Sequence, residues 1–203
     1  MDRPGLNGMD RRAMLAGLAC SGLAACSQGM PGKPDEEPLT GRAAWDGMEG
    51  LRTSIAALDP SVNVDEAARA AHVAYSETRA LALAYEIEDP PLVHNAKVNA
   101  GLKPRGLCWH WAEDMEKRLR QEQFRTLDLH RAIANWRNPI LIDHSTVIIS
   151  AEGYAMPDGI VLDPWREGGV LFWSSVRADT RYDWTEREEV FRIKSAKGVR
   201  RRS

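Results

Sequence analysis

The chain has 203 residues, of which 43 % are hydrophobic and 28 % are charged, and its formal net charge is −2. This size and composition are typical of one globular domain with an apolar core, and they exclude an intrinsically disordered chain and a protein with several membrane spans. Because the charges nearly balance, no overall field attracts polyanions, and we expect no nucleic-acid partner.

The first part of the chain has the pattern of an export signal. Residues 9–27 read MDRRAMLAGLACSGLAACS, in which Arg11 and Arg12 precede an uncharged run that ends in small residues before a cysteine. A charged start, a short apolar run and a small-residue end are the three parts of a signal peptide, and this run is too short to cross a bilayer. The arginine pair is compatible with both general secretion and twin-arginine export. Either Met1 or Met9 fits the start of translation.

The end of this signal, Leu23-Ala24-Ala25-Cys26, resembles the lipobox of bacterial lipoproteins. The resemblance implies cleavage before Cys26 and lipid chains such as palmitate on that residue, whereas Ser27 after it implies an outer-membrane protein facing the periplasm. Several chains hold a protein firmly in a membrane, where one chain alone does not. We therefore expect a signal peptide over residues 1–25, a membrane anchor on Cys26 and a flexible, proline-containing tether over residues 26–42. The alternative is an ordinary secretory signal with a chance cysteine at its end.

Hydrophobic periodicity in the remaining chain predicts helices first and strands afterwards. Apolar residues recur at helical spacing over residues 43–58, 64–87 and 107–121. Asp89-Pro90-Pro91 is expected to stop the second helix, since proline lacks an amide donor, and a loop follows to Gly106. Shorter β-like runs, separated by turn residues, then cover residues 126–133, 140–150, 159–162 and 170–176. We expect an α+β domain over residues 43–192, with N-terminal helices packed on an antiparallel sheet, and a basic tail over residues 193–203.

Cys108 is the one free thiol expected in the mature protein, because processing removes Cys20 and modifies Cys26. A disulfide within the chain and a four-cysteine zinc site are therefore excluded, because one thiol is too few for either. Cys108 lies in the first turn of the predicted helix 107–121, where the helix dipole favours an anion. To attack a carbonyl carbon, the thiol also needs a base, and a histidine oriented by a carboxylate is a suitable one.

His144 and Asp163 are the candidates for that base and its carboxylate. His144 opens an apolar predicted strand and Asp163 closes the next one, so antiparallel pairing would bring both side chains to one edge of the sheet. His110 lies two positions after Cys108 on the same helix, and we expect it to point away from the thiol.

Three segments together resemble the transglutaminase-like superfamily. Gly106-Leu107-Cys108-Trp109-His110-Trp111-Ala112 is similar to its G-x-C-x-x-x-A motif, and His144 at a strand start and Leu162-Asp163-Pro164 are similar to its second and third motifs. The resemblance implies a papain-like fold with Cys108 as nucleophile, His144 as base and acid, and Asp163 as orienting carboxylate. It further implies acyl transfer or hydrolysis at peptide or amide bonds of an envelope substrate, with no metal and no cofactor. The chain departs from the family at Ser145, where an aromatic residue is common.

An enzyme of this kind also needs donors for the oxyanion of its intermediate. The Cys108 amide is one candidate, and the side chain of Asn99 or Asn95 upstream is the second.

Other interpretations fit the same residues. A lone cysteine on an apolar helix face is often a small core residue, and the chain would then be a non-catalytic envelope lipoprotein that uses the fold for binding or scaffolding. A cell-wall peptidase of the other papain-like group lacks support, because its usual sequence around the cysteine is missing. A zinc site of Cys108, His110, His144 and Asp163 is disfavoured by the divergence of the first two side chains.

Overall fold

The computed structural model describes residues 42–200, and within them the side chains of residues 46–196. The predicted signal peptide, the lipid-bearing Cys26 and the tether up to residue 41 lie outside the described residues.

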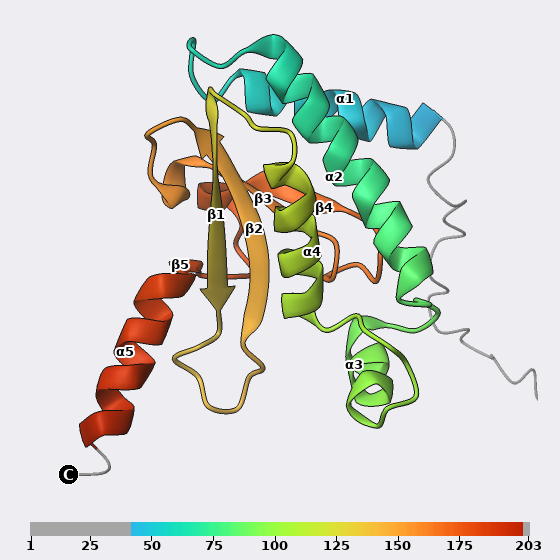
Figure 1. The fold of residues 1–203 in the computed structure, drawn as a ribbon, viewed down its shortest axis with the longest axis vertical. Coiled ribbons are helices and arrows are strands. Elements are labelled where there is room, and N and C mark those ends of the chain that lie inside the picture. The colour runs from blue at the N-terminus through green and yellow to red at the C-terminus, as the bar shows by residue number, and fades with distance from the viewer. Residues whose placement is uncertain (1–41, 201–203) are drawn as a thin grey trace, which may run out of the picture. The chain divides into compact units, whose positions relative to one another are not determined.

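The described chain is an α+β domain with a five-stranded antiparallel sheet, as the order of predicted elements indicates (Figure 1). The strand order is β4-β3-β2-β1-β5, in which β1 to β4 form a meander and β5 returns to the free edge of β1. The helices are α1 (Arg42–Ala56), α2 (Val64–Ala84), α3 (Pro91–Asn99), α4 (Cys108–Arg120) and α5 (Arg187–Arg200). The strands are β1 (Leu127–Ala134), β2 (His144–Ala151), β3 (Ile160–Asp163), β4 (Phe172–Ser175) and β5 (Thr185–Glu186). Short 3-10 turns, η1 (Met156–Asp158) and η2 (Val176–Ala178), flank β3 and β4.

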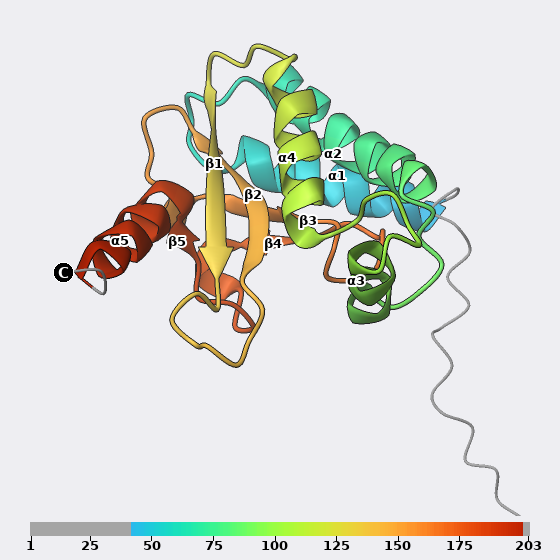
Figure 2. The ribbon, with the colours of Figure 1, turned by 60° about the horizontal axis from the view of Figure 1, so that its bottom comes forward.

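Helices α1, α2 and α4 pack together beside the sheet, whereas α5 lies at its opposite edge near β5 (Figures 1 and 2). The main core joins these three helices to one face of the sheet, and its fully buried members include Leu51, Ile55, Ala70, Ala71, Met115, Leu119, Val147 and Ile149. The alanines of α2 carry small side chains, which lets the neighbouring helices approach closely. The three predicted helical segments therefore owe their periodicity to one shared core.

Strand β2 is the structural centre, because it pairs with β1 on one side and β3 on the other and is buried along its whole length. Its side chains alternate between two cores. Val147 and Ile149 face the helical core, whereas Ile148 faces a second core that contains Val161 and Trp184. The even-numbered face is also the face on which His144 lies.

The structure corrects the predicted loop between residues 89 and 106, which contains helix α3. Pro91 occupies the first turn of α3, where a proline is tolerated because the amide has no partner within the helix. Helix α2 has already ended at Ala84, and Glu86 adopts a left-handed φ of 55°.

The predicted strand 140–150 is wrong at its start, because β2 begins at His144 and residues 140–143 belong to the connection from β1. The side chains of Asn135 and Asn138 bond to the backbone of this connection, at the Ile142 carbonyl and the Ile140 amide. Such local bonds compete with strand pairing.

The end of the chain also differs from expectation. Strand β5 and helix α5 were not predicted, and α5 continues through residues 193–200 of the segment expected to be a basic tail. At the other end, α1 begins at Arg42. No helix within residues 42–200 is long and apolar enough to cross a membrane.

Candidate active site

The β2–β3 pairing brings His144 and Asp163 together, as the predicted strand order implies. Val147 lies opposite Leu162, and this register puts the first residue of β2 and the last residue of β3 on one face at one end of the sheet. The His144 Nε2 atom lies 2.6 Å from the Asp163 Oδ2 atom, and both side chains are buried. The contact leaves the other ring nitrogen, Nδ1, available for a different partner.

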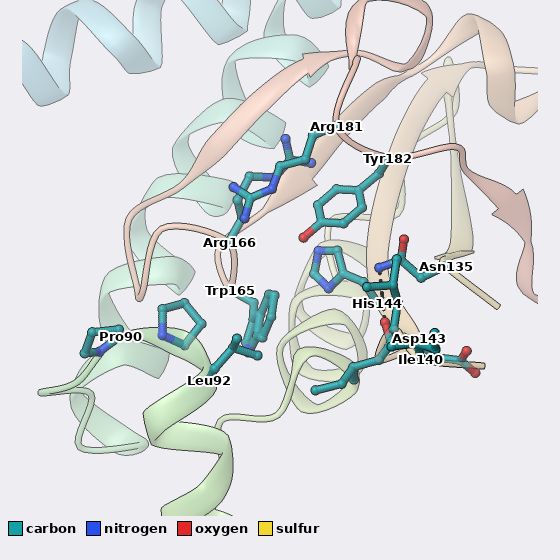
Figure 3. Close-up of a pocket in the computed structure, with 13 residues that line it drawn as sticks. Pro90, Leu92, Asn135, Ile140, Asp143, His144, Trp165, Arg166, Arg181 and Tyr182 are labelled. Atoms are coloured by element: carbon teal, nitrogen blue, oxygen red, sulfur yellow. Dashed lines mark hydrogen bonds between the residues drawn. The ribbon is translucent and has the colours of Figure 1, made fainter. Parts of the chain in front are cut away.

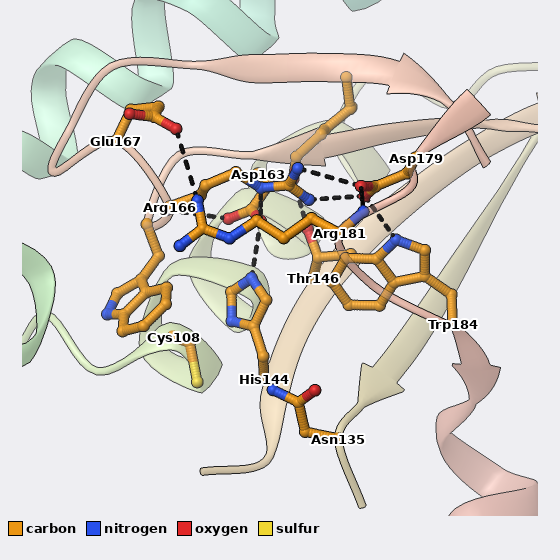
Figure 4. A network of polar contacts seen from close by, with 12 residues as sticks. Cys108, Asn135, His144, Thr146, Asp163, Arg166, Glu167, Asp179, Arg181 and Trp184 are labelled. Carbon is orange, nitrogen blue, oxygen red and sulfur yellow. Dashed lines mark hydrogen bonds and ion pairs between the residues drawn. The ribbon is translucent and has the colours of Figure 1, made fainter. Parts of the chain in front are cut away.

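Cys108 is the first residue of α4 and approaches the same end of the sheet. The ring of His144 lies between Asp163 and the side on which Cys108 is found (Figure 4). The His144 Nδ1 atom is buried and has no hydrogen-bond partner among the described residues. The Cys108 thiol donates to the Asp143 carbonyl oxygen at 3.4 Å and is 5 % exposed. The structure thus brings together all three residues of the predicted triad. The thiol is hydrogen-bonded to the carbonyl of Asp143, the residue before His144.

The start of α4 is organised by His110. Its Nδ1 atom accepts hydrogen bonds from the Gly106 and Leu107 amides, at 3.1 and 3.2 Å. Burial, and secondarily the charge of Arg105, lowers the pKa of His110, so the neutral ring can act as an acceptor. His110 therefore points away from the thiol, as predicted, and its role is to cap the helix.

The Cys108 amide makes no hydrogen bond within the part of the chain that the structure describes. An amide in the first turn of a helix has no partner within that helix. It is therefore a suitable donor to an oxygen that develops negative charge beside the thiol.

The two predicted side-chain donors to the oxyanion fall in different places. Asn99 is exposed at the C-terminal end of α3. Asn95 is buried, and its Oδ1 atom accepts from the Trp165 indole at 3.1 Å. Trp165 in turn packs on the His144 ring, with 4.7 Å between the ring centroids. Asn95 thus supports the position of the histidine through an indole.

Arg166 and Asp179 extend the site behind Asp163. The Arg166 Nε atom donates to Asp163 Oδ2 at 3.0 Å, and its backbone amide donates to Asp163 Oδ1 at 3.1 Å. The far end of the Arg166 guanidinium forms an ion pair with Asp179 at 2.6 Å, and Asp179 also accepts from the Trp184 indole (Figure 4). Each of the three charged side chains is almost wholly buried. The network satisfies both oxygens of Asp163 and fixes the carboxylate against the histidine.

The charges of this network determine the protonation of the site. Burial alone disfavours the charged ring, but the carboxylate of Asp163 outweighs it, and with a smaller contribution from Cys108 it raises the pKa of His144 to about 9. Burial likewise opposes ionisation of Asp163, yet His144 and Arg166 hold the pKa of that carboxyl below its usual value. An imidazolium–carboxylate pair is therefore the favoured state near neutral pH.

Two cavities adjoin the site and share Asp143 in their walls. The larger cavity, of about 480 Å³, is termed the apolar cavity. Its walls include Leu92, Leu141, Ile142, His144, Trp165 and Tyr182. Figure 3 shows it between the start of α3 and the connection that precedes β2. The smaller, of about 340 Å³, has Cys108, Trp109, Arg131 and Phe191 in its walls. Cys108 and His144 thus each line a cavity, and Asp143 lies in the walls of both.

Sequence reasoning missed Arg166, Asp179 and the capping role of His110. Arg166 had a local signal, because it follows Asp163 by three residues in a turn. His110 occupies the helix position at which capping side chains reach back to the preceding amides. Asp179 had no signal, since its contacts form only when the segment after β4 folds over the sheet. Among the described residues, no three histidine, cysteine or acidic side chains gather as metal ligands.

The fold and the site define an α+β protein that holds a thiol, an imidazole and a carboxylate at one end of an antiparallel sheet. Comparison of the chain with models of known protein families, with curated proteins and with solved structures finds no match.

Proposed function

We propose that the protein is a thiol-dependent acyl-transfer enzyme of the transglutaminase-like, papain-like type, which hydrolyses or transfers peptide or amide groups. The observation that carries the proposal is the His144 ring, bonded through Nε2 to a buried carboxylate and left with an unpaired Nδ1 beside Cys108. A ring with a raised pKa accepts a thiol proton readily, and the resulting imidazolium stabilises the thiolate.

The reaction follows from these atoms. In the thiolate–imidazolium pair, which the raised pKa of His144 favours, the Cys108 proton resides on His144 Nδ1. The thiolate Sγ bonds to the substrate carbonyl carbon while the π electrons of the carbonyl move to its oxygen. The Cys108 amide donates to that oxyanion. The C–N bond then breaks, the leaving amine takes the proton from Nδ1, and a thioester remains on the enzyme. Water, or an acceptor amine, attacks the thioester with His144 again as the base and regenerates the thiol.

Asp163 acts through the histidine. Its hydrogen bond to Nε2 fixes the ring orientation and stabilises the imidazolium formed in each proton transfer. Arg166 keeps this carboxylate ionised and in place, so we assign Arg166 as a positioning residue.

We further propose that the domain works at the cell envelope, anchored by lipid on Cys26, with a peptide or protein substrate there. The support is the signal-like segment of residues 9–27 and the lipobox-like end at Cys26.

One observation favours the rival function of a non-catalytic binding or scaffolding lipoprotein. The thiol is almost fully buried and donates to a carbonyl oxygen, as core cysteines do. The two functions differ in whether the thiol reacts in the folded protein.

Iodoacetamide labelling of the full chain as a function of pH separates them. The tryptic peptide of residues 106–117 contains Cys108 as its only cysteine, so its mass reports this site alone. We expect Cys108 to be labelled well below pH 8, although a free cysteine thiol has a pKa near 8.5. We expect His144→Ala to lose this reactivity. His72→Ala, which removes an exposed histidine of α2, is the control and should behave as the wild type. Labelling only after unfolding would establish Cys108 as a core residue and support the binding lipoprotein.

A further inference from the structure

The apolar cavity is surrounded by large aliphatic side chains that remain exposed. Ile140, Leu141 and Ile142 are 89 %, 51 % and 56 % exposed, and Leu92 on the facing helix is 60 % exposed. All four line the same hollow, from two segments far apart in the sequence (Figure 3). Single exposed apolar residues are ordinary, but several gathered around one cavity indicate a surface that binds another molecule.

The cavity ends at the proposed catalytic base. His144, Trp165 and Tyr182 lie at its inner end, and the two aromatic rings pack on the imidazole at centroid distances of 4.7 and 4.6 Å. A group that fills the cavity is therefore adjacent to His144, which the proposed mechanism places beside the substrate bond. This contact with His144 favours an occupant that is part of the substrate itself.

The charged groups in the walls have partners within the protein. Arg166 is paired with Asp163 and Asp179, Arg181 lies 3.9 Å from Glu167, and Asp143 forms an ion pair with Lys194. A charged substrate side chain would lose its hydration here without gaining an unpaired counter-ion. An apolar side chain gains free energy by covering the exposed aliphatic groups.

From these contacts we propose that the substrate is an extended polypeptide with a large aliphatic or aromatic side chain next to the scissile bond, and that the apolar cavity binds this side chain. The proposal rests on the proposed function, because it assumes that Cys108 attacks the substrate. A cavity of about 480 Å³ is in the range that binds whole small molecules, so a leucine or phenylalanine side chain fits within it.

Peptides with a chloromethyl ketone end test this specificity without knowledge of the natural substrate. The thiolate displaces chloride from such a reagent, which forms a C–S bond at Cys108. We would compare blocked dipeptide reagents that carry leucine, phenylalanine, serine, aspartate or lysine at each position in turn. Rates are measured on the full chain in detergent from the mass of peptide 106–117, and each is divided by the iodoacetamide rate of the same protein.

We expect leucine or phenylalanine at one position to label Cys108 at least about tenfold faster than serine or aspartate, the discrimination that small differences in apolar contact produce. Leu92→Asp places a carboxylate at the cavity and should reduce this preference by about tenfold and favour a lysine reagent. Val93→Asp is the matched control, because Val93 is exposed on the same turn but does not line the cavity. It should leave the preference unchanged.

Failure of this proposal and failure of the proposed function give different results. If iodoacetamide does not label Cys108 in the folded protein, the proposed function is wrong. Rapid iodoacetamide labelling without preference among the peptide reagents, or with equal effects of Leu92→Asp and Val93→Asp, overturns the substrate proposal alone. If Leu92→Asp instead weakens binding to phosphatidylcholine vesicles and leaves the preference intact, the aliphatic groups are a membrane contact and the proposal is also overturned.

Discussion

Substitution of Asp163 by asparagine tests the buried charge network most directly. Asp163 is wholly buried, and its oxygens accept from His144 Nε2, from Arg166 Nε and from the Arg166 amide. Asparagine has nearly the same shape but retains one acceptor oxygen and carries an NH₂ group that only donates. At least one of the three donors therefore loses its acceptor, and the negative charge between His144 and Arg166 disappears.

The expected cost follows from the burial of these groups. Removing one partner of a buried ion pair costs about 3–5 kcal/mol, because the remaining charge stays out of water without compensation. Since Asp179 still pairs with Arg166, we expect a value near the lower end, about 3 kcal/mol. In the wild type, the charge of Asp163 raises the pKa of His144 more than burial lowers it. Without that charge the effect of burial remains, so the pKa of His144 should fall from about 9 to below 6.5.

Two measurements check these values, namely urea unfolding at pH 7 and NMR titration of the His144 ring. The iodoacetamide reactivity of Cys108 should shift to higher pH, and turnover on any cleaved peptide should fall by about 10⁴-fold, the loss known where the same change is made beside a catalytic histidine. Asp143→Asn is a matched control, because this exposed carboxylate pairs with Lys194 at the surface and should cost less than about 1 kcal/mol. Equal stability of the two variants, or an unchanged His144 titration, would refute the account of the network.

Three further predictions concern stability. Gly106→Ala should lower the free energy of unfolding in urea by more than the roughly 1–3 kcal/mol of a strained backbone alone, because Gly106 has φ +121° and an added Cβ would lie 2.3 Å from His94 Nε2. Gly153→Ala is the control and should cost less, because Gly153 also has a positive φ, +77°, but an added Cβ would meet no atom within 4 Å. Glu66→Gln should lower the thermal unfolding temperature, at a cost of about 1–3 kcal/mol, because the Glu66 carboxylate accepts from the Arg125 and Thr126 amides; unchanged Cys108 labelling would show that the effect is local to that turn. Finally, the raised pKa of His144 predicts a contribution to the free energy of unfolding that is fully present below pH 6.5 and is lost as the pH rises through about 9. His144→Ala should not show this loss, and the same pH profile of unfolding in the wild type and in His144→Ala would contradict the prediction.

Several features of the site were predictable because their signals are local. The inward face of α4 was evident from apolar residues at helical spacing, and Cys108, Trp111 and Met115 are indeed buried. The apolar run after His144 predicted a buried strand, which β2 is. Antiparallel order then placed Asp163 beside His144.

Other features were not predictable because their signals are spread over distant segments. Helix α3 was hidden by Pro91, which usually marks a break but here begins a helix. The basic residues that continue α5 have no apolar periodicity, so they resembled a tail. Asn95 was one of two candidate oxyanion donors, and the bond from the Trp165 indole to its amide oxygen had no signal in the sequence.

The sequence by itself determined the α+β order of elements and the residue types of the candidate triad, because periodicity and spacing are properties of neighbouring residues. Only the tertiary structure decided how the triad is charged and what lies beside it. The ionisation of His144 depends on its burial and on a carboxylate that Arg166 and Asp179 hold in place, and the apolar cavity forms from Leu92 and the connection before β2. Desolvation and contacts between distant segments exist only after the chain has folded, so neither can be computed from spacing along it.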